Sequence, residues 1–82
     1  MEIKNTIPTV IWDAKKFGWK TYLKGKYDSL GGCPNWLYET IRRISASGQS
    51  QTDSIQIVEG GKYQYAIQFL NDDILIYSKK AR

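Results

Sequence analysis

The C-terminal third of the chain alternates between strand-forming and turn-forming residues. Residues 54–79 contain three runs rich in Ile, Val, Tyr and Phe, separated by Gly60-Gly61 and by Asn71-Asp72-Asp73. β-Branched and aromatic residues favour a pleated sheet, and Gly, Asn and Asp tolerate the backbone conformations of tight turns. The pattern predicts an antiparallel three-stranded meander.

The second and third runs of this meander predict one apolar face. A two-residue turn at Asn71-Asp72 places Phe69 opposite Ile74 and Ile67 opposite Ile76. Directly opposed residues of an antiparallel pair share a face. The expected apolar side consists of Tyr65, Ile67, Phe69, Ile74 and Ile76. The other side is mixed and more polar.

The first hairpin of the meander allows two registers. A two-residue turn at 60–61 would point Ile55 and Ile57 away from the apolar side. A three-residue loop at 60–62, with one glycine in a left-handed bulge, would pair Ile57 with Tyr65 and extend that side across all three strands. We predict the bulged loop. The alternative is that the first strand of the meander faces a different layer.

Two strands are expected before the meander. Residues 7–13 predict the first, with Pro8 at its start or on a sheet edge because proline has no N–H to donate. Residues 17–24 alternate with period two and predict a second strand that forms a hairpin with the first. Its apolar face would hold Phe17, Trp19, Thr21 and Leu23, and its basic face Lys20, Tyr22, Lys24 and Lys26.

Residues 34–48 predict the single helix. Pro34 suits the first turn and Asn35 the N-cap. Glu39 and Arg43 have the i,i+4 spacing of a favourable charge pair. The apolar face, which we expect to meet the sheet, consists of Leu37, Ile41 and Ile44.

The elements therefore follow the order ββ-α-βββ in a single domain spanning residues 1–82. One helix on one face of an antiparallel sheet of up to five strands is an α+β architecture. Trp12 and Trp19 are expected in the helix-side core or at its rim. The short strands leave a partly closed barrel as the alternative.

Length and composition limit the class of protein. The chain has 82 residues, 41% of them hydrophobic, which is enough for one compact core. It contains no apolar run of the ~18 residues that a membrane span needs, and its N-terminus has no apolar leader segment. A single cysteine, Cys33, cannot form an internal disulfide. These features predict a cytoplasmic protein that does not engage a membrane.

The positive charge is concentrated in one segment. The net charge is +4, and residues 15–27 contain five lysines and no acidic residue. A local basic patch attracts polyanions, of which nucleic acid is the commonest, and tyrosines among the lysines could stack on bases. The alternative is that the lysines keep a sheet edge soluble. The candidate contact residues are Lys15, Lys16, Lys20, Tyr22, Lys24, Lys26 and Tyr27.

The residue types argue against most enzyme classes. Histidine is absent, which removes the commonest general base, the usual catalytic triads and most zinc sites. Cys33 precedes the helix N-terminus, a position that lowers a thiol pKa, but a packing role explains it better. We therefore expect a non-enzymatic binding protein without catalytic residues, metal or cofactor. A small RNase that holds phosphate with Lys, Arg and Tyr is a third hypothesis, after a protein-binding role.

A protein-binding module is the alternative function. Small aromatic-rich domains often act by covering a partner's surface, as phage and mobile-element inhibitors do, and Tyr, Trp and Arg dominate such interfaces. The candidate residues are Trp36, Tyr38 and Arg42 on the outer side of the helix. The partner is then nucleic acid or a nucleic-acid-associated protein. An edge strand could also pair with a second copy of the chain and give a homodimer.

Overall fold

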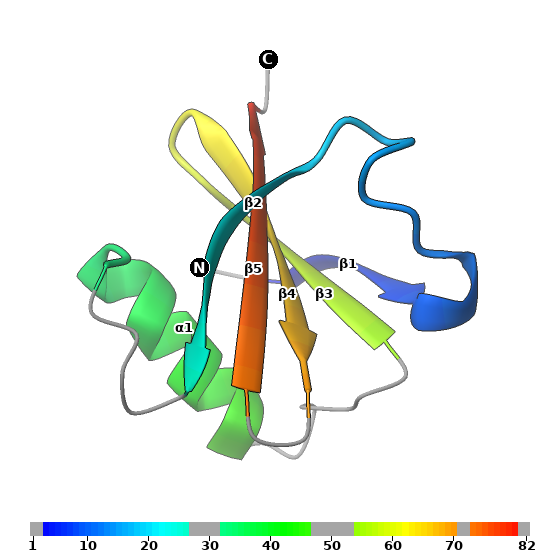
Figure 1. Ribbon diagram of the computed structural model, residues 1–82. Coiled ribbons are helices and arrows are strands. Elements are labelled where there is room, and N and C mark those ends of the chain that lie inside the picture. Colours follow the sequence, from blue (N-terminus) through cyan, green and yellow to red (C-terminus); the bar gives the residue numbers. More distant parts are fainter. Residues whose placement is uncertain (1–2, 27–31, 47–53, 71–72, 81–82) are drawn as a thin grey trace.

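The described residues form a single open sheet with one α-helix. The computed structural model describes residues 3–26, 32–46, 54–70 and 73–80. Its elements are β1 (Ile3–Pro8), the 3-10 helix η1 (Thr9–Ile11), β2 (Lys20–Lys26), α1 (Asn35–Ala46), β3 (Ser54–Gly60), β4 (Tyr63–Phe69) and β5 (Asp73–Lys80). The strands form one antiparallel sheet in the order β1-β3-β4-β5-β2. Helix α1 lies on one side of it (Figure 1). The predicted α+β class and ββ-α-βββ order are confirmed, and the sheet does not close into a barrel.

The predicted register of the second hairpin is confirmed. Phe69 lies opposite Ile74, and Ile67 lies opposite Ile76. The backbone N–H of Leu70 donates to the carbonyl of Asp73 at 2.8 Å, which closes the two strands beside the turn.

The predicted bulged loop of the first hairpin is wrong. Gly60 pairs with Tyr63, so only Gly61 and Lys62 form the turn. Gly61 has φ 66°, whereas no described residue other than glycine has a positive φ. A positive φ at the first central position alone is the pattern of a type II′ turn, whose twist matches that of the two strands. A two-residue turn one position further along therefore replaces the bulge.

This register places hydrophobic residues on both faces of the sheet. Val58 lies opposite Tyr65, whereas Ile57 lies opposite Ala66. The helix-side core contains Leu37, Ile41, Ile44, Val58, Tyr65, Ile67, Phe69, Ile74 and Ile76. The second core, on the other face, contains Ile55, Ile57 and Ala66, with Ile7, Trp12, Trp19 and Tyr77 packed against it. The alternative, in which the first strand of the meander faces a different layer, is thus the correct one for Ile55 and Ile57. Trp12 and Trp19, expected in the helix-side core or at its rim, pack against the second core.

The predicted N-terminal hairpin is also wrong. β1 ends at Pro8 instead of extending to residue 13, and it pairs with β3. The chain then turns through η1, where the N–H of Trp12 donates to the carbonyl of Thr9 at 3.1 Å. β2 pairs with β5, at the opposite edge of the sheet. Segment 9–19 consequently runs along the side of the sheet away from α1, where its tryptophans cover the second core (Figure 1).

An irregularity in β2 overturns the predicted alternation. The register against β5 shifts between Thr21 and Leu23, which lie opposite Tyr77 and Ile76 respectively. A β-bulge reverses the facing of the residues that follow it. Leu23 therefore packs on the helix-side core, whereas Trp19, expected on the same face, packs on the second core.

Helix α1 begins one residue earlier than its predicted cap implies. The carbonyl of Pro34 accepts from the N–H groups of Leu37 and Tyr38, each at 3.1 Å, so Pro34 and not Asn35 occupies the N-cap position. The predicted apolar face is confirmed by the burial of Leu37, Ile41 and Ile44. In the described part of the chain, no helix combines the length and apolar character needed to cross a membrane.

Candidate functional site

Four aromatic rings gather on the helix side of the sheet, between the middle strand β4 and the edge strand β2. We call this group, Tyr22, Trp36, Tyr63 and Tyr65, the tyrosine cluster. Tyr65 lies at its centre, with its ring centroid 5.4 Å from Tyr22, 5.6 Å from Trp36 and 6.5 Å from Tyr63. Tyr65 is only 7% exposed, but Tyr22 and Tyr63 are 39% and 43% exposed. Tyr22 and Tyr63 therefore pack against the buried Tyr65, and part of each of these two outer residues is exposed to solvent.

Three different elements hold the outer rings of the cluster. Tyr22 lies in the bulged part of β2, and its hydroxyl donates to the carbonyl of Gly32 at 3.4 Å. Trp36 lies in the first turn of α1, where the hydroxyl of Thr40 donates to its carbonyl at 2.7 Å. Tyr63 opens β4 directly after the II′ turn. In Figure 1 the β3–β4 turn and the start of α1 lie on the left of the view.

Two lysines lie on the same face as the cluster. Lys20 of β2 is opposite Ser78, which is itself opposite Tyr65. Lys80 at the end of β5 is opposite Tyr63. Because opposed residues share a face, both ammonium groups belong to the helix side of the sheet. Both lysines are exposed.

The bulge separates the lysines that the sequence placed on one face. Lys24 lies opposite Leu75 and Lys26 opposite Asp73, on the face away from α1. The prediction that Lys20, Tyr22, Lys24 and Lys26 share one face is therefore wrong, although all four are exposed on the same edge strand.

The remaining candidate contacts lie away from the strand. Lys15 and Lys16 belong to a turn closed by the bonds from the N–H of Lys16 to the Asp13 carboxylate, 3.1 Å, and from the N–H of Trp19 to the carbonyl of Ala14, 2.8 Å. Both lysines are exposed. Tyr27 lies outside the described residues.

The lysines of β2 and Lys80 of β5 form no ion pair with a described carboxylate. The same holds for Arg43, so the i,i+4 pair predicted with Glu39 does not form. Lys20, Lys24 and Lys26 of β2 are exposed.

The cluster is neutral and partly desolvated. Burial raises the pKa of the Tyr65 phenol, and the neighbouring Tyr22, Tyr63 and Cys33 raise it further. Burial also raises the pKa of the Cys33 thiol, which outweighs a hydrogen bond from its backbone. The expectation that the helix N-terminus lowers the Cys33 pKa is therefore wrong, and a nucleophilic role loses its main support.

The opposite face of the sheet is covered by its own aromatic group. Trp12 lies 5.8 Å from Trp19 and 5.5 Å from Tyr77, centroid to centroid. The ammonium of Lys79 lies 5.6 Å from the Trp19 ring centroid, within cation–π range. The indole N–H of Trp12 is buried and has no hydrogen-bond partner among the described residues. These rings pack on the second core and leave little aromatic surface open.

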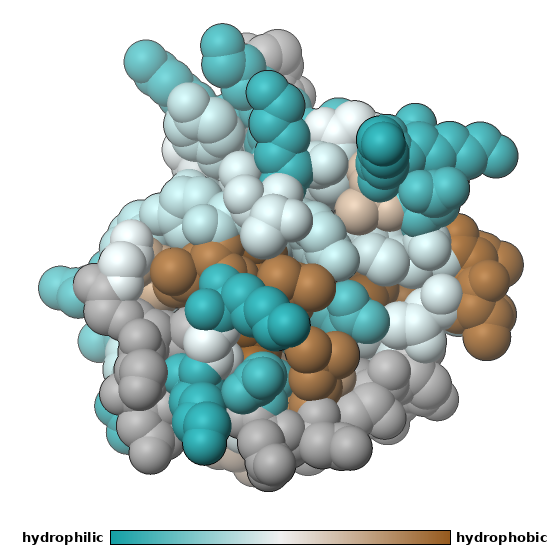
Figure 2. Space-filling model, viewed as in Figure 1, coloured by the Kyte–Doolittle hydropathy of each residue, from teal (hydrophilic) through white to brown (hydrophobic). Residues whose placement is uncertain are grey.

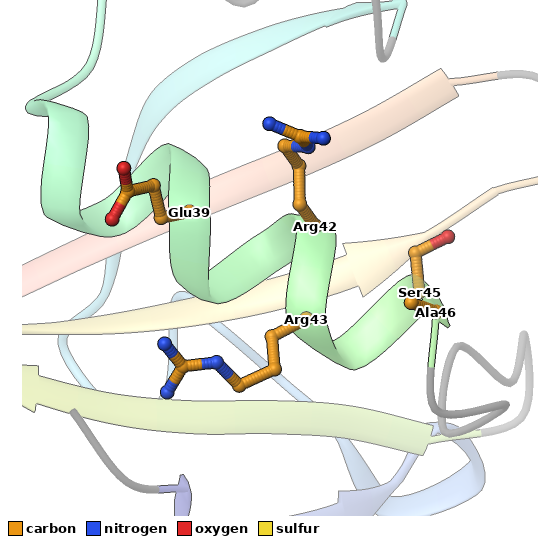
Figure 3. Close-up of a pocket in the computed structure, with 5 residues that line it drawn as sticks. All are labelled: Glu39, Arg42, Arg43, Ser45 and Ala46. Atoms are coloured by element: carbon orange, nitrogen blue, oxygen red, sulfur yellow. The ribbon is translucent and has the colours of Figure 1, made fainter.

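The outer side of α1 carries a charged hollow. A hollow of 530 Å³ at its C-terminal half is lined by Glu39, Arg42, Arg43, Ser45 and Ala46, all of them exposed (Figure 3). Trp36 and Tyr38, expected beside Arg42, are instead half-buried against the helix-side core. Of the three predicted protein-contact residues, Arg42 is exposed, and Trp36 and Tyr38 keep part of their surface in solvent.

One small apolar patch is exposed elsewhere. Val10 and Ile11 of η1 are 89% and 64% exposed. Hydrophobic residues protrude at the edge of the molecule where η1 lies (Figures 1 and 2). Neither residue packs in the core, although the sequence placed both in a strand.

The lysine-rich segment gave no indication of one cluster residue, Tyr63, or of Lys80 on the same face. Tyr63 and Lys80 are distant in sequence from the lysine-rich segment, and only strand pairing brings them to β2. The register of the second hairpin, extended to residues 63 and 80, would have placed these two side chains opposite each other.

The described residues contain no group of three or more His, Cys, Asp or Glu side chains able to hold a metal ion. Comparison with protein-family models, curated proteins and solved structures finds no match.

Proposed function

We propose that this protein is a non-enzymatic nucleic-acid-binding protein whose contact surface is centred on β2. The observation that carries the proposal is the combination of charge and aromatic surface on this strand. Exposed lysines without an acidic partner among the described residues lie next to a tyrosine whose ring is 39% exposed. Lysines neutralise phosphates, and aromatic rings stack on bases.

The position of β2 favours an extended anionic ligand. β2 is an edge strand, so it has a neighbour on one side only. Lys20 lies on one face of this edge, and Lys24 and Lys26 on the other. A phosphate backbone that follows the edge can reach all three lysines, whereas a small anion can reach only one or two.

The test is a salt titration of binding to fluorescent RNA and DNA oligonucleotides. For the wild type, the logarithm of the association constant should fall linearly with the logarithm of salt concentration. The triple variant Lys20→Ala, Lys24→Ala, Lys26→Ala should reduce the slope by roughly 2 to 3, because each phosphate contact contributes about 0.7 to 0.9.

A charge-matched variant separates a site from general basicity. Substituting Arg42, Arg43 and Lys62 by Ala removes the same number of charges from the outer side of α1 and the β3–β4 turn. This control should leave the slope close to that of the wild type. Equal slopes for the two triple variants, or no binding at low salt, would reject β2 as a nucleic-acid interface.

A protein partner is the second candidate, because two adjacent apolar side chains are exposed in η1. Val10 and Ile11 have the exposure expected of residues that an interface would cover. This candidate covers both an inhibitor that blocks a partner's surface and a nucleic-acid-associated partner. A binding partner lost on substitution in η1 but kept in the lysine triple variant would favour it.

A further inference from the structure

Packing of the hydrophobic core does not explain why the tyrosine cluster includes exposed rings. Its central ring, Tyr65, is buried by its neighbours and belongs to the helix-side core. Tyr63 adds a fourth ring at 6.5 Å, yet it remains 43% exposed directly after a turn. A ring held by others and left open on one side is suited to stacking against a further aromatic surface.

The cations beside the cluster lie on the same side of the sheet. Lys20 and Lys80 share the helix-side face, the first in the row of Tyr65 and the second opposite Tyr63. The open aromatic surface is therefore flanked by positive charge from both β2 and β5. Planar rings next to ammonium groups complement a base and its adjoining phosphate.

We infer that the tyrosine cluster binds unpaired bases, so that the preferred ligand is single-stranded nucleic acid. The bases stack on Tyr63 and Tyr22, and the phosphates contact Lys20 and Lys80. In a duplex the faces of the bases are occupied by their neighbours, so only their edges and the backbone are accessible. This inference rests on the proposed nucleic-acid function and specifies the form of nucleic acid.

Stacking predicts a dependence on ring shape and not on the hydroxyl group. Tyr63→Phe keeps the ring and should bind a single-stranded oligonucleotide as the wild type does. Tyr63→Leu removes the ring and should bind at least about fivefold more weakly, the lower end of the effect of losing one base–aromatic contact. Binding is measured by fluorescence anisotropy at fixed salt.

Phe17 provides a matched control. It is also an exposed aromatic residue, 46% exposed, but it lies in the turn that precedes β2 and is not part of the cluster. Phe17→Leu should leave affinity unchanged. Unfolding midpoints of all variants, measured by circular dichroism, verify that each binds in the folded state.

Tryptophan fluorescence gives an independent readout. Trp36 is the one tryptophan in the cluster, whereas Trp12 and Trp19 pack on the other face. Quenching of tryptophan emission by a single-stranded oligonucleotide should persist in Trp19→Phe and be largely lost in Trp36→Phe. Quenching that persists in Trp36→Phe would place the bases elsewhere.

The outcomes distinguish the inference from the function on which it rests. The inference fails if Tyr63→Leu binds like the wild type, or if duplexes bind as tightly as single strands. The proposed function still stands in that case, provided that the lysine triple variant reduces the salt slope. If no oligonucleotide binds at low salt, both fail. Tighter single-strand binding that requires the ring at position 63 supports both.

Discussion

At the scale of single residues, environment decides chemistry more than sequence position does. Cys33 lies just before the helix N-terminus, where the positive end of the helix dipole stabilises a thiolate. Its side chain nevertheless packs against the helix-side core, and desolvation favours the neutral thiol. The same desolvation keeps the Tyr65 phenol neutral beneath the exposed rings.

The raised pKa of Cys33 predicts slow alkylation in the folded protein. At a given pH near or above neutrality, the folded chain should react with iodoacetamide more slowly than the urea-unfolded chain, since fewer thiolates are present and access is reduced. The pH dependence of folding stability follows from the same pKa shift of Cys33. The folded state holds the thiol proton more tightly, so this contribution to stability is complete below the unfolded pKa and is lost as pH rises through the folded one.

The measurement compares alkylation rates of folded and unfolded protein, followed by mass spectrometry, from neutral pH to about pH 10. A folded protein that reacts as fast as the unfolded one, or faster, would show that the helix end controls the thiol after all.

At the scale of elements, the sheet is stabilised from both faces. α1 covers one face with Leu37, Ile41 and Ile44. No described α-helix covers the other face, where segment 9–19 supplies Trp12 and Trp19 instead. An irregular segment with two large aromatic residues can thus take the place of a second helix.

We therefore predict that the two cores contribute comparably to folding. Ile41 and Ile55 are both fully buried, the first facing the sheet from α1 and the second in β3 on the far face. Ile41→Ala and Ile55→Ala should each lower the free energy of unfolding by about 2–5 kcal/mol, the usual cost of such a core truncation. Urea unfolding, with Val10→Ala as an exposed control, gives these values. A loss at Ile55 no larger than that of the control would mean that the second core does not contribute.

At the scale of the whole molecule, two surfaces of different character are separate. The basic edge is β2, and the tyrosine cluster extends from β2 to Tyr65 on the middle strand β4. The apolar residues of η1 follow β1, at the other edge of the sheet. The edges also differ as sites of self-association. β2 carries three lysines, which repel a second copy of the same strand. A homodimer through an edge strand would therefore use β1 in preference to β2.

Substitution in η1 should separate the two candidate functions. Val10→Asp combined with Ile11→Asp changes only exposed side chains, so the unfolding free energy should shift by no more than about 0.5 kcal/mol. Oligonucleotide affinity should fall little, and any apolar protein or self-contact through η1 should be lost. Sedimentation velocity of the double variant measures self-association, and fluorescence anisotropy measures its oligonucleotide affinity. An affinity as low as that of the lysine triple variant would show that η1 and β2 do not serve separate functions.

The local sequence pattern was sufficient to predict those features that depend only on residues close together in the chain. The meander, the register of its second hairpin and the apolar face of α1 all follow from residues a few positions apart, because strand alternation, turn chemistry and helical spacing are local properties. The basic character of β2 is likewise visible in composition. The meander, the second-hairpin register and the apolar face of α1 appear in the structure where the sequence placed them, whereas β2 spans Lys20–Lys26 instead of the predicted residues 17–24.

Only the tertiary structure decided how those elements combine. The turn at Gly61 and Lys62 shifted β3 by one position and sent Ile55 and Ile57 to a second core, because a one-residue slip reverses every side chain of a strand. The bulge in β2 divided its lysines between two faces for the same reason. Pairing of β2 with β5, at a distance of some fifty residues in sequence, brought Lys20 and Tyr22 to Tyr63, Tyr65 and Lys80. Pairings between distant strands depend on the packing of the whole sheet, so the local pattern of the chain could not specify the site that they form.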